Sequence, residues 1–100
     1  MIAVRVRLSA QVVEFVRAQA PEPRNRLRRA LRDLASEAGD IKPLEGPLQD
    51  YCRLRVSAYR IVFRYATSKT IECIFAERRN VVYEVFVEAV IERLSGREEG

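Results

Sequence analysis

Arginines gather in one stretch of this chain, at a spacing suited to binding phosphate. Residues 53–79 hold seven basic side chains against two acidic ones, a net charge of +5, whereas residues 83–100 hold two against five, a net charge of −3. Arg53 and Arg55 would share one face of a strand, and Arg60 follows after a short turn. On adjacent strands these three guanidinium groups can converge on one phosphate, since each offers a fork of N–H donors. Nucleic acid is the natural ligand of such a patch.

Arginines on a sheet also have a plainer explanation. An antiparallel sheet with one solvated face commonly carries them for solubility and to discourage edge pairing. The net charge of +4 over 100 residues is too small to decide between the two interpretations.

Other chemistry is limited by what the chain lacks. It has no histidine, which excludes zinc sites, cysteine–histidine nucleophiles and Ser-His-Asp triads, and we expect no metal and no cofactor. Cys52 and Cys73 lie in apolar alternating runs and are expected to be buried free thiols. No apolar run approaches the roughly 20 residues that span a bilayer, so we expect a cytoplasmic protein without a membrane partner.

The first half of the chain predicts one strand and two helices. Residues 2–8 alternate strictly, with Leu8 on the apolar face, which predicts a half-buried strand. Ser9 is an N-cap candidate for a helix over residues 10–19. A second helix is expected from Pro21 to Ala38, with Gly39 as a left-handed stop, and residues 40–47 are expected to form a loop.

The second half predicts three strands and a helix. Period-two alternation covers residues 51–56, 59–65 and 70–76, and in the last run Ile71, Cys73 and Phe75 are expected on one face. A final helix is expected from Tyr83 or Glu84 to just before Gly96, followed by a frayed tail.

These elements predict an α+β fold of order βααβββα. Two helices would pack on one face of a small antiparallel sheet, and residues 1–100 would form a single domain.

Three segments carry the pattern of a known family. They are Leu44-Glu45-Gly46, Tyr51-Cys52-Arg53-Leu54-Arg55-Val56-Ser57-Ala58-Tyr59-Arg60-Ile61-Val62-Phe63 and Phe75-Ala76-Glu77-Arg78-Arg79-Asn80-Val81-Val82-Tyr83. The set resembles the RelE/ParE family of type II toxin–antitoxin toxins, which shows an L-x-G loop, a YRLRV-G-x-YRI hairpin and a strand ending in G-H-R-R-x-V-Y. The resemblance covers nearly the whole chain and implies a microbial RNase-like fold. Ala58 stands where the family has glycine, and Ala76-Glu77 where it has Gly-His.

For the RelE branch, the resemblance implies a metal-independent endoribonuclease. Such a toxin cuts messenger RNA in the ribosomal A site and thereby inhibits translation. The 2′-hydroxyl attacks the adjacent phosphate and leaves a 2′,3′-cyclic phosphate. Matching positions one by one implies catalytic roles for Arg53, Arg55, Arg60, Arg78 and Tyr83, and RNA-binding roles for Arg53, Arg55, Arg60, Arg64 and Arg79.

The implied roles differ between positions. Arg53 and Arg55 would bind phosphate and assist removal of the 2′-hydroxyl proton, and Arg60 would stabilise the pentavalent phosphate. Arg78 would protonate the leaving 5′-oxygen, with its neighbour Arg79 as an alternative. Tyr83 would stack on or orient the nucleotide, or its ring would simply pack against the sheet.

A guanidinium is a poor general base, because it holds its proton far above neutral pH. Either Tyr83, Glu77, water or a ribosomal group removes the 2′-hydroxyl proton, or the protein stabilises the transition state without an efficient base and is a slow nuclease.

The resemblance also leaves other functions open. A ParE-like toxin would inhibit DNA gyrase by binding and would need no catalytic residues, and a toxin-like domain without activity would act as a binding module. Each alternative implies a cognate antitoxin encoded by an adjacent gene. The ribonuclease alternative adds the ribosome and messenger RNA as partners.

Overall fold

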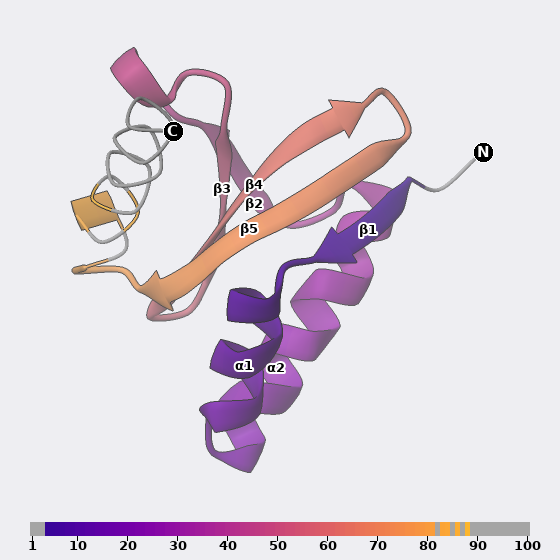
Figure 1. Ribbon diagram of the computed structural model, residues 1–100. Coiled ribbons are helices and arrows are strands. Elements are labelled where there is room, and N and C mark those ends of the chain that lie inside the picture. Colours follow the sequence, from indigo (N-terminus) through magenta and orange to yellow (C-terminus); the bar gives the residue numbers. More distant parts are fainter. Residues whose placement is uncertain (1–3, 82, 85, 87, 89–100) are drawn as a thin grey trace.

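A computed structural model describes residues 4–81, 83, 84, 86 and 88 of the chain (Figure 1). It is an α+β fold in which two helices cover one face of the sheet, as the sequence predicts, although the sheet has five strands and not four. The strands lie in the order β1-β5-β4-β3-β2. The elements are β1 (Arg5–Leu8), α1 (Ala10–Ala18), α2 (Pro21–Asp33), the 3₁₀ turn η1 (Leu34–Ser36), β2 (Asp40–Pro43), the 3₁₀ turn η2 (Gly46–Leu48), β3 (Cys52–Val56), β4 (Tyr59–Thr67) and β5 (Thr70–Arg78).

The sheet is mixed rather than purely antiparallel. The predicted meander of β3, β4 and β5 is confirmed, but β1 pairs in parallel with β5. Two parallel strands need a crossover connection between them, and here the connection from β1 to β5 starts with the two helices. Leu8 ends β1 on the helix side, the face predicted for it, but 41% of its surface is exposed. The strand lies at the edge of the sheet, and its contact with the core is made by Val4 and Val6.

Helix α1 begins where the sequence predicts, and its first turn is bound to β5. The Ser9 hydroxyl accepts a hydrogen bond from the Val12 amide (3.2 Å) and donates one to the Ile74 carbonyl (2.7 Å). The Gln11 side chain bonds both backbone groups of Ala76, each at 2.8 Å. Because β1 ends at Leu8, this carboxamide takes the place that a continuing strand would fill.

Helix α2 starts at Pro21, as predicted, but ends five residues before Ala38. Asp33 is its last residue, and Glu37, not Gly39, makes the left-handed stop, with φ of 53°. The Tyr65 hydroxyl donates to the Glu37 carboxylate at 2.6 Å, which fixes the chain at this unusual conformation. The same hydrogen bond, with burial, raises the pKa of Tyr65 to about 12.

Residues 40–47 are not a continuous loop, as expected, because Asp40–Pro43 forms edge strand β2. It pairs antiparallel with β3, with Ile41 opposite Leu54 on the core side. Proline is tolerated there because an edge strand leaves one row of backbone groups unpaired.

A one-residue bulge interrupts β5. Val62 of β4 lies opposite Phe75, but Phe63 lies opposite Cys73, so Ile74 has no partner on β4. The bulge reverses the alternation of side chains beyond it. The prediction that Phe75 shares a face with Ile71 and Cys73 is therefore wrong: Phe75 lies on the far face, and Ala76 takes its place in the core.

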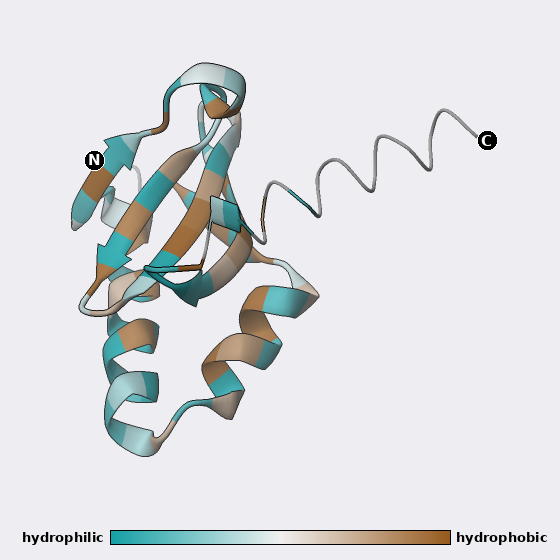
Figure 2. Ribbon diagram, turned by 90° about the vertical axis from the view of Figure 1, so that its left-hand side faces the viewer, coloured by the Kyte–Doolittle hydropathy of each residue, from teal (hydrophilic) through white to brown (hydrophobic). Residues whose placement is uncertain are grey.

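Two hydrophobic clusters lie on opposite faces of the sheet. Along the strands, hydrophobic residues alternate with hydrophilic ones (Figure 2). The main cluster fills the space beneath the helices, with Leu27, Leu34, Leu54, Ile61 and Phe63 among its fully buried members. The second cluster covers the other face: Val62 and Phe86 are buried there, against Leu44, Leu48, Tyr51, Ile74, Phe75 and Tyr83.

The predicted start of the last helix is confirmed. Tyr83, Glu84, Phe86 and Glu88 are helical, whereas the remainder of that predicted helix and the predicted frayed tail lie outside the described residues. Phe86 is 2% exposed and makes an edge-on contact with the Tyr51 ring, at a centroid distance of 5.1 Å. The chain thus returns to cover the sheet face opposite α1 and α2.

Both cysteines are free thiols, as predicted. Cys73 is buried, and burial raises the pKa of its thiol to about 12, whereas Cys52 is only half-buried. Within the described part of the chain, no helix combines the length and apolar character needed to cross a membrane.

The turn into β2 depends on Gly39. Its φ of +132° suits glycine alone, and a Cβ built there would lie 2.9 Å from Cδ1 of buried Leu54. We expect Gly39→Ala to lower the free energy of unfolding by about 2–3 kcal/mol. Gly46 is a matched control, because its φ is +62° but no atom lies within 4 Å of the added carbon. Gly46→Ala should cost only about 1 kcal/mol in urea unfolding; equal losses would contradict this account.

Candidate nucleic-acid interface

The sheet face opposite the helices carries the predicted arginines. Leu54, Val56 and Ile61 point into the main cluster, so the residues that alternate with them point to the other side. Those residues are Arg53, Arg55 and Arg60, and with Arg79 they are called the arginine face below.

One row of this face crosses four strands. Asp40 of β2 lies opposite Arg55 of β3, which lies opposite Arg60 of β4, which lies opposite Glu77 of β5. Directly opposed residues in antiparallel strands have Cα atoms about 4.5–5.5 Å apart. Two guanidinium groups therefore lie side by side at the centre of the row, with a carboxylate residue at each end.

Arg60 is the central residue of the arginine face. Burial lowers the pKa of Arg60, and the positive charges of Arg55 and Arg53 lower it further. Arg79 acts in the same direction, whereas Tyr83 raises this pKa. Like charges held together repel one another, and a bound anion relieves that repulsion. The arrangement therefore favours a ligand with a concentrated negative charge.

Backbone carbonyls hold the Arg60 side chain in place. Its Nη1 donates to the carbonyls of Ser57 (3.0 Å) and Tyr59 (2.8 Å), at the turn between β3 and β4. Arg53 is held less tightly, since its Nη1 lies 3.4 Å from both the carbonyl and the carboxylate oxygen of Asp40. The remaining N–H donors of Arg60 can bind a phosphate with little loss of side-chain freedom.

Arg64 lies on the same side of β4 but apart from the others. It is four positions along the strand from Arg60, a distance of about 13 Å. Its Nη2 lies 3.8 Å from the Glu72 carboxylate, and both side chains are substantially exposed. The structure thus gives Arg64 a carboxylate partner of its own, outside the arginine face.

The structure separates the two neighbouring arginines at the end of β5. Arg78 lies opposite Tyr59, whose ring packs edge-on against Phe15 of α1 at 5.7 Å. Arg78 is thus directed to the side that the helices cover, whereas Arg79 follows on the side of Arg60. The Arg79 amide donates to the Ala58 carbonyl at 2.9 Å, which fixes it beside the same hairpin turn.

For Tyr83, packing of the ring against the sheet is confirmed, and contact with a nucleotide stays a prediction. Its half-buried ring belongs to the second cluster, and its phenol is close enough to Arg60 to raise the pKa of that guanidinium. The residues that sequence reasoning missed are Asp40, assigned to a loop, and Phe86, which covers the neighbouring apolar surface. The alternation of Asp40, Ile41 and Lys42 is the signal that could have revealed β2.

The two departures from the family pattern fit the backbone. Among the described non-glycine residues, only Glu37 and Ser57 have positive φ, so Ala58 occupies an ordinary conformation. Ala76 is fully buried in the main cluster, where its methyl group is accommodated. The structure thus shows no steric conflict at either alanine.

No group of three or more metal-ligating side chains occurs within the described residues. The arginine face instead offers fixed positive charge flanked by carboxylates, a combination suited to a phosphodiester.

Comparison with known proteins adds structural neighbours. No family model matches the chain, and no curated protein matches it either. A chain of the RelBE2 toxin–antitoxin complex from Mycobacterium tuberculosis is similar, with a TM-score of 0.69 and 20% identity over 78% of this chain and 100% of that one. A chain of the RelE–RelB complex from Pyrococcus horikoshii has a TM-score of 0.61 and 23% identity, over 78% of this chain and 97% of that one. YafQ from E. coli has a TM-score of 0.61 and 14% identity, over 78% of this chain and 96% of that one.

The match covers nearly the whole length of each neighbouring chain, and at these sequence identities it shows the fold. The resemblance seen in the hairpin motif is therefore confirmed at the level of structure: the chain has the fold of the RelE/ParE toxins.

Proposed function

We propose that this protein is the toxin of a toxin–antitoxin pair and cleaves messenger RNA at the ribosome. The observation that carries the proposal is the juxtaposition of Arg55 and Arg60 on the sheet face opposite the helices, with Arg53 and Arg79 beside them. The described neighbours support the partner, because the structures from M. tuberculosis and P. horikoshii are complexes of a toxin with its antitoxin.

The arginines would stabilise charge on the phosphate under attack. As the RNA 2′-oxygen bonds to phosphorus, negative charge grows on the non-bridging oxygens. Arg60 and Arg55 supply fixed donors for those oxygens, and Arg53 and Arg79 hold the flanking phosphates. The bond from phosphorus to the 5′-oxygen then breaks, leaving a 2′,3′-cyclic phosphate and a 5′-hydroxyl.

Protons must move to and from two oxygens in this reaction. Glu77 lies opposite Arg60 and is the carboxylate of the row that would take the 2′-hydroxyl proton. One of its oxygens accepts the Arg78 amide at 3.0 Å, which orients the carboxylate and leaves the second oxygen for the RNA. Tyr83, which is close enough to Arg60 to affect its pKa, would give its phenol proton to the 5′-oxygen and regain one from solvent.

Ribosomes programmed with a defined messenger RNA test this function. The purified protein should cut within the A-site codon and leave 2′,3′-cyclic phosphate ends. Arg60→Ala should lower the single-turnover rate by about 10²–10³-fold, the usual loss for one preorganised donor to a developing charge. Arg29→Ala is the control, because Arg29 is an exposed residue of α2 on the opposite side of the sheet.

Two results would contradict the proposal. One is a folded wild-type protein that does not cut the messenger RNA, and the other is an Arg60→Ala variant that cuts it as fast as the wild type does. Inhibition of gyrase supercoiling with trapped cleaved DNA, without RNA cleavage, would instead assign the fold to gyrase inhibition.

The separation of Arg78 from Arg79 gives a further prediction. Fluorescence anisotropy with a labelled single-stranded RNA measures the dissociation constant at several salt concentrations. Each phosphate contact removed lowers the slope of log K against log salt by about 0.7. We expect Arg79→Ala to lower this slope by about 0.7 and Arg78→Ala to lower it by less. The reverse order would show that Arg78 is the residue that reaches the RNA.

A further inference from the structure

The hairpin turn between β3 and β4 contains a strained residue. Strand β3 ends at Val56 and β4 begins at Tyr59, so Ser57 and Ala58 form a two-residue loop. Ser57 has a positive φ of 55°, a conformation that suits glycine better than a residue with a Cβ. Ser57 is exposed, so packing of its side chain does not explain the conformation. Strained backbone of this kind persists where the surrounding structure holds it, often beside a functional group.

Three consecutive carbonyls of this turn hold the arginine face. Those of Ser57 and Tyr59 accept hydrogen bonds from Nη1 of Arg60, at 3.0 and 2.8 Å. That of Ala58 accepts the Arg79 amide at 2.9 Å. The φ angle sets the direction of a residue's own carbonyl relative to the preceding chain, so a return of Ser57 to negative φ would redirect the first of these acceptors. The conformation of the turn and the position of Arg60 therefore depend on each other.

The turn holds Arg60 against repulsion from its neighbours. Arg55 lies directly opposite Arg60 on β3, and the charges of Arg55 and Arg53 both lower the pKa of Arg60. Like charges opposite one another on adjacent strands are destabilising, so an unheld side chain would turn away. The two carbonyls keep the Arg60 guanidinium beside Arg55 before any anion arrives.

The same two hydrogen bonds decide which edge of the Arg60 guanidinium is available. A guanidinium has one fork of N–H donors at its end, formed by Nη1 and Nη2, and one along its side, formed by Nε and Nη2. Nη1 is bonded to the turn, so the end fork is occupied in part. The side fork, which makes no hydrogen bond within the described part of the chain, can therefore bind two oxygens of one phosphate.

We propose that Ser57 is a positioning residue for Arg60: through its positive φ it holds Nη1, so that the Nε–H and Nη2–H donors bind a phosphate side-on. This inference deepens the proposed function and rests on it, because the phosphate is the one that the RNA 2′-oxygen attacks. Arg55 would reach a further oxygen of the same phosphate from the adjacent strand.

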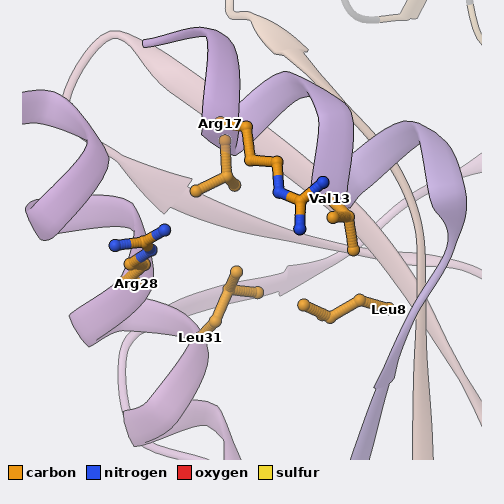
Figure 3. Close-up of a pocket in the computed structure, with 6 residues that line it drawn as sticks. Leu8, Val13, Arg17, Arg28 and Leu31 are labelled. Atoms are coloured by element: carbon orange, nitrogen blue, oxygen red, sulfur yellow. The ribbon is translucent and has the colours of Figure 1, made fainter. Parts of the chain in front are cut away.

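A second pair of arginines competes for any added anion. Arg17 and Arg28 line a pocket between β1, α1 and α2, on the helix side of the sheet (Figure 3). The rest of the lining is apolar. An anion bound there would be insensitive to Ser57 and Arg60, so Arg28→Ala is the control that separates the two places.

NMR of the arginine side chains tests the proposal, with inorganic phosphate as the probe. In ¹⁵N-labelled protein, phosphate should shift the Nε–H signal of Arg60, which is assigned by its loss in Arg60→Lys. Ser57→Val should weaken phosphate binding about fivefold, since a β-branched residue resists positive φ and releases the immobilised arginine. Ser57→Gly should bind phosphate within about twofold of the wild type, because glycine adopts this φ freely.

Three controls separate this effect from a general loss of stability. Glu37 is the other described non-glycine residue with positive φ, and it is bonded to Tyr65 rather than to the arginine face. Glu37→Val should therefore lower stability in urea but keep phosphate affinity within about twofold, and so should Arg28→Ala keep it. In an Arg60→Ala background, Ser57→Val should also change phosphate affinity less than about twofold, because its effect acts through Arg60.

Three results would overturn the proposal. They are an Arg60 Nε–H signal that phosphate does not shift, a folded Ser57→Val variant that binds phosphate as tightly as the wild type, and equal losses in Ser57→Gly and Ser57→Val, which would assign the effect to the serine hydroxyl.

The wild-type protein decides by itself if Ser57→Val does not fold. Without phosphate, the Nη protons of Arg60 should give separate NMR signals, because the two carbonyls slow rotation of the group; merged signals would contradict the proposal. Phosphate binding needs no ribosome, so it can succeed where cleavage of messenger RNA fails. Cleavage by the wild type can likewise succeed where the phosphate test fails.

Discussion

The bulge at Ile74 decides the chemistry of both faces of this sheet. By adding one unpaired residue to β5, it puts Ala76 under α1 and directs Phe75 to the opposite side. Everything that follows on the strand is reversed with them, so Glu77 comes to lie opposite Arg60. Without that extra residue, the face that carries the arginines would lose its carboxylate and its apolar neighbour at once.

Sequence reasoning succeeded where a local rule acts alone. The Ser9 cap, the proline that starts α2 and the alternation of Arg53 and Arg55 with Leu54 each depend on residues a few positions apart. It failed where a distant residue decides. Helix α2 ends early at Asp33, and the 3₁₀ turn that follows it ends at a left-handed Glu37 that is held by Tyr65, far along the chain. Which of Arg78 and Arg79 lies on the side of Arg60 depends on the bulge in β5, and no residue pattern in positions 70–78 predicts that bulge.

The protein presents two basic surfaces of different character. On the arginine face, guanidinium groups lie beside one another with carboxylates at the ends of the row, and Phe86 seals the apolar surface next to them. On the helix side, Arg17 and Arg28 line an apolar pocket beside Leu8. The first surface concentrates positive charge, and the second sets positive charge beside apolar side chains. A small net charge thus conceals two basic surfaces, on opposite sides of one sheet.

The clamp between Gln11 and Ala76 has a consequence for motion. The Ala76 amide proton is held by a side chain of α1 rather than by a neighbouring strand. Its exchange with deuterated solvent therefore reports separation of α1 from β5, while the amides paired between β4 and β5 report opening of the sheet itself. Since Glu77 follows directly on Ala76, loosening of the helix would reach the carboxylate beside Arg60 before the sheet comes apart, and helix docking and the geometry of the arginine face would fluctuate together.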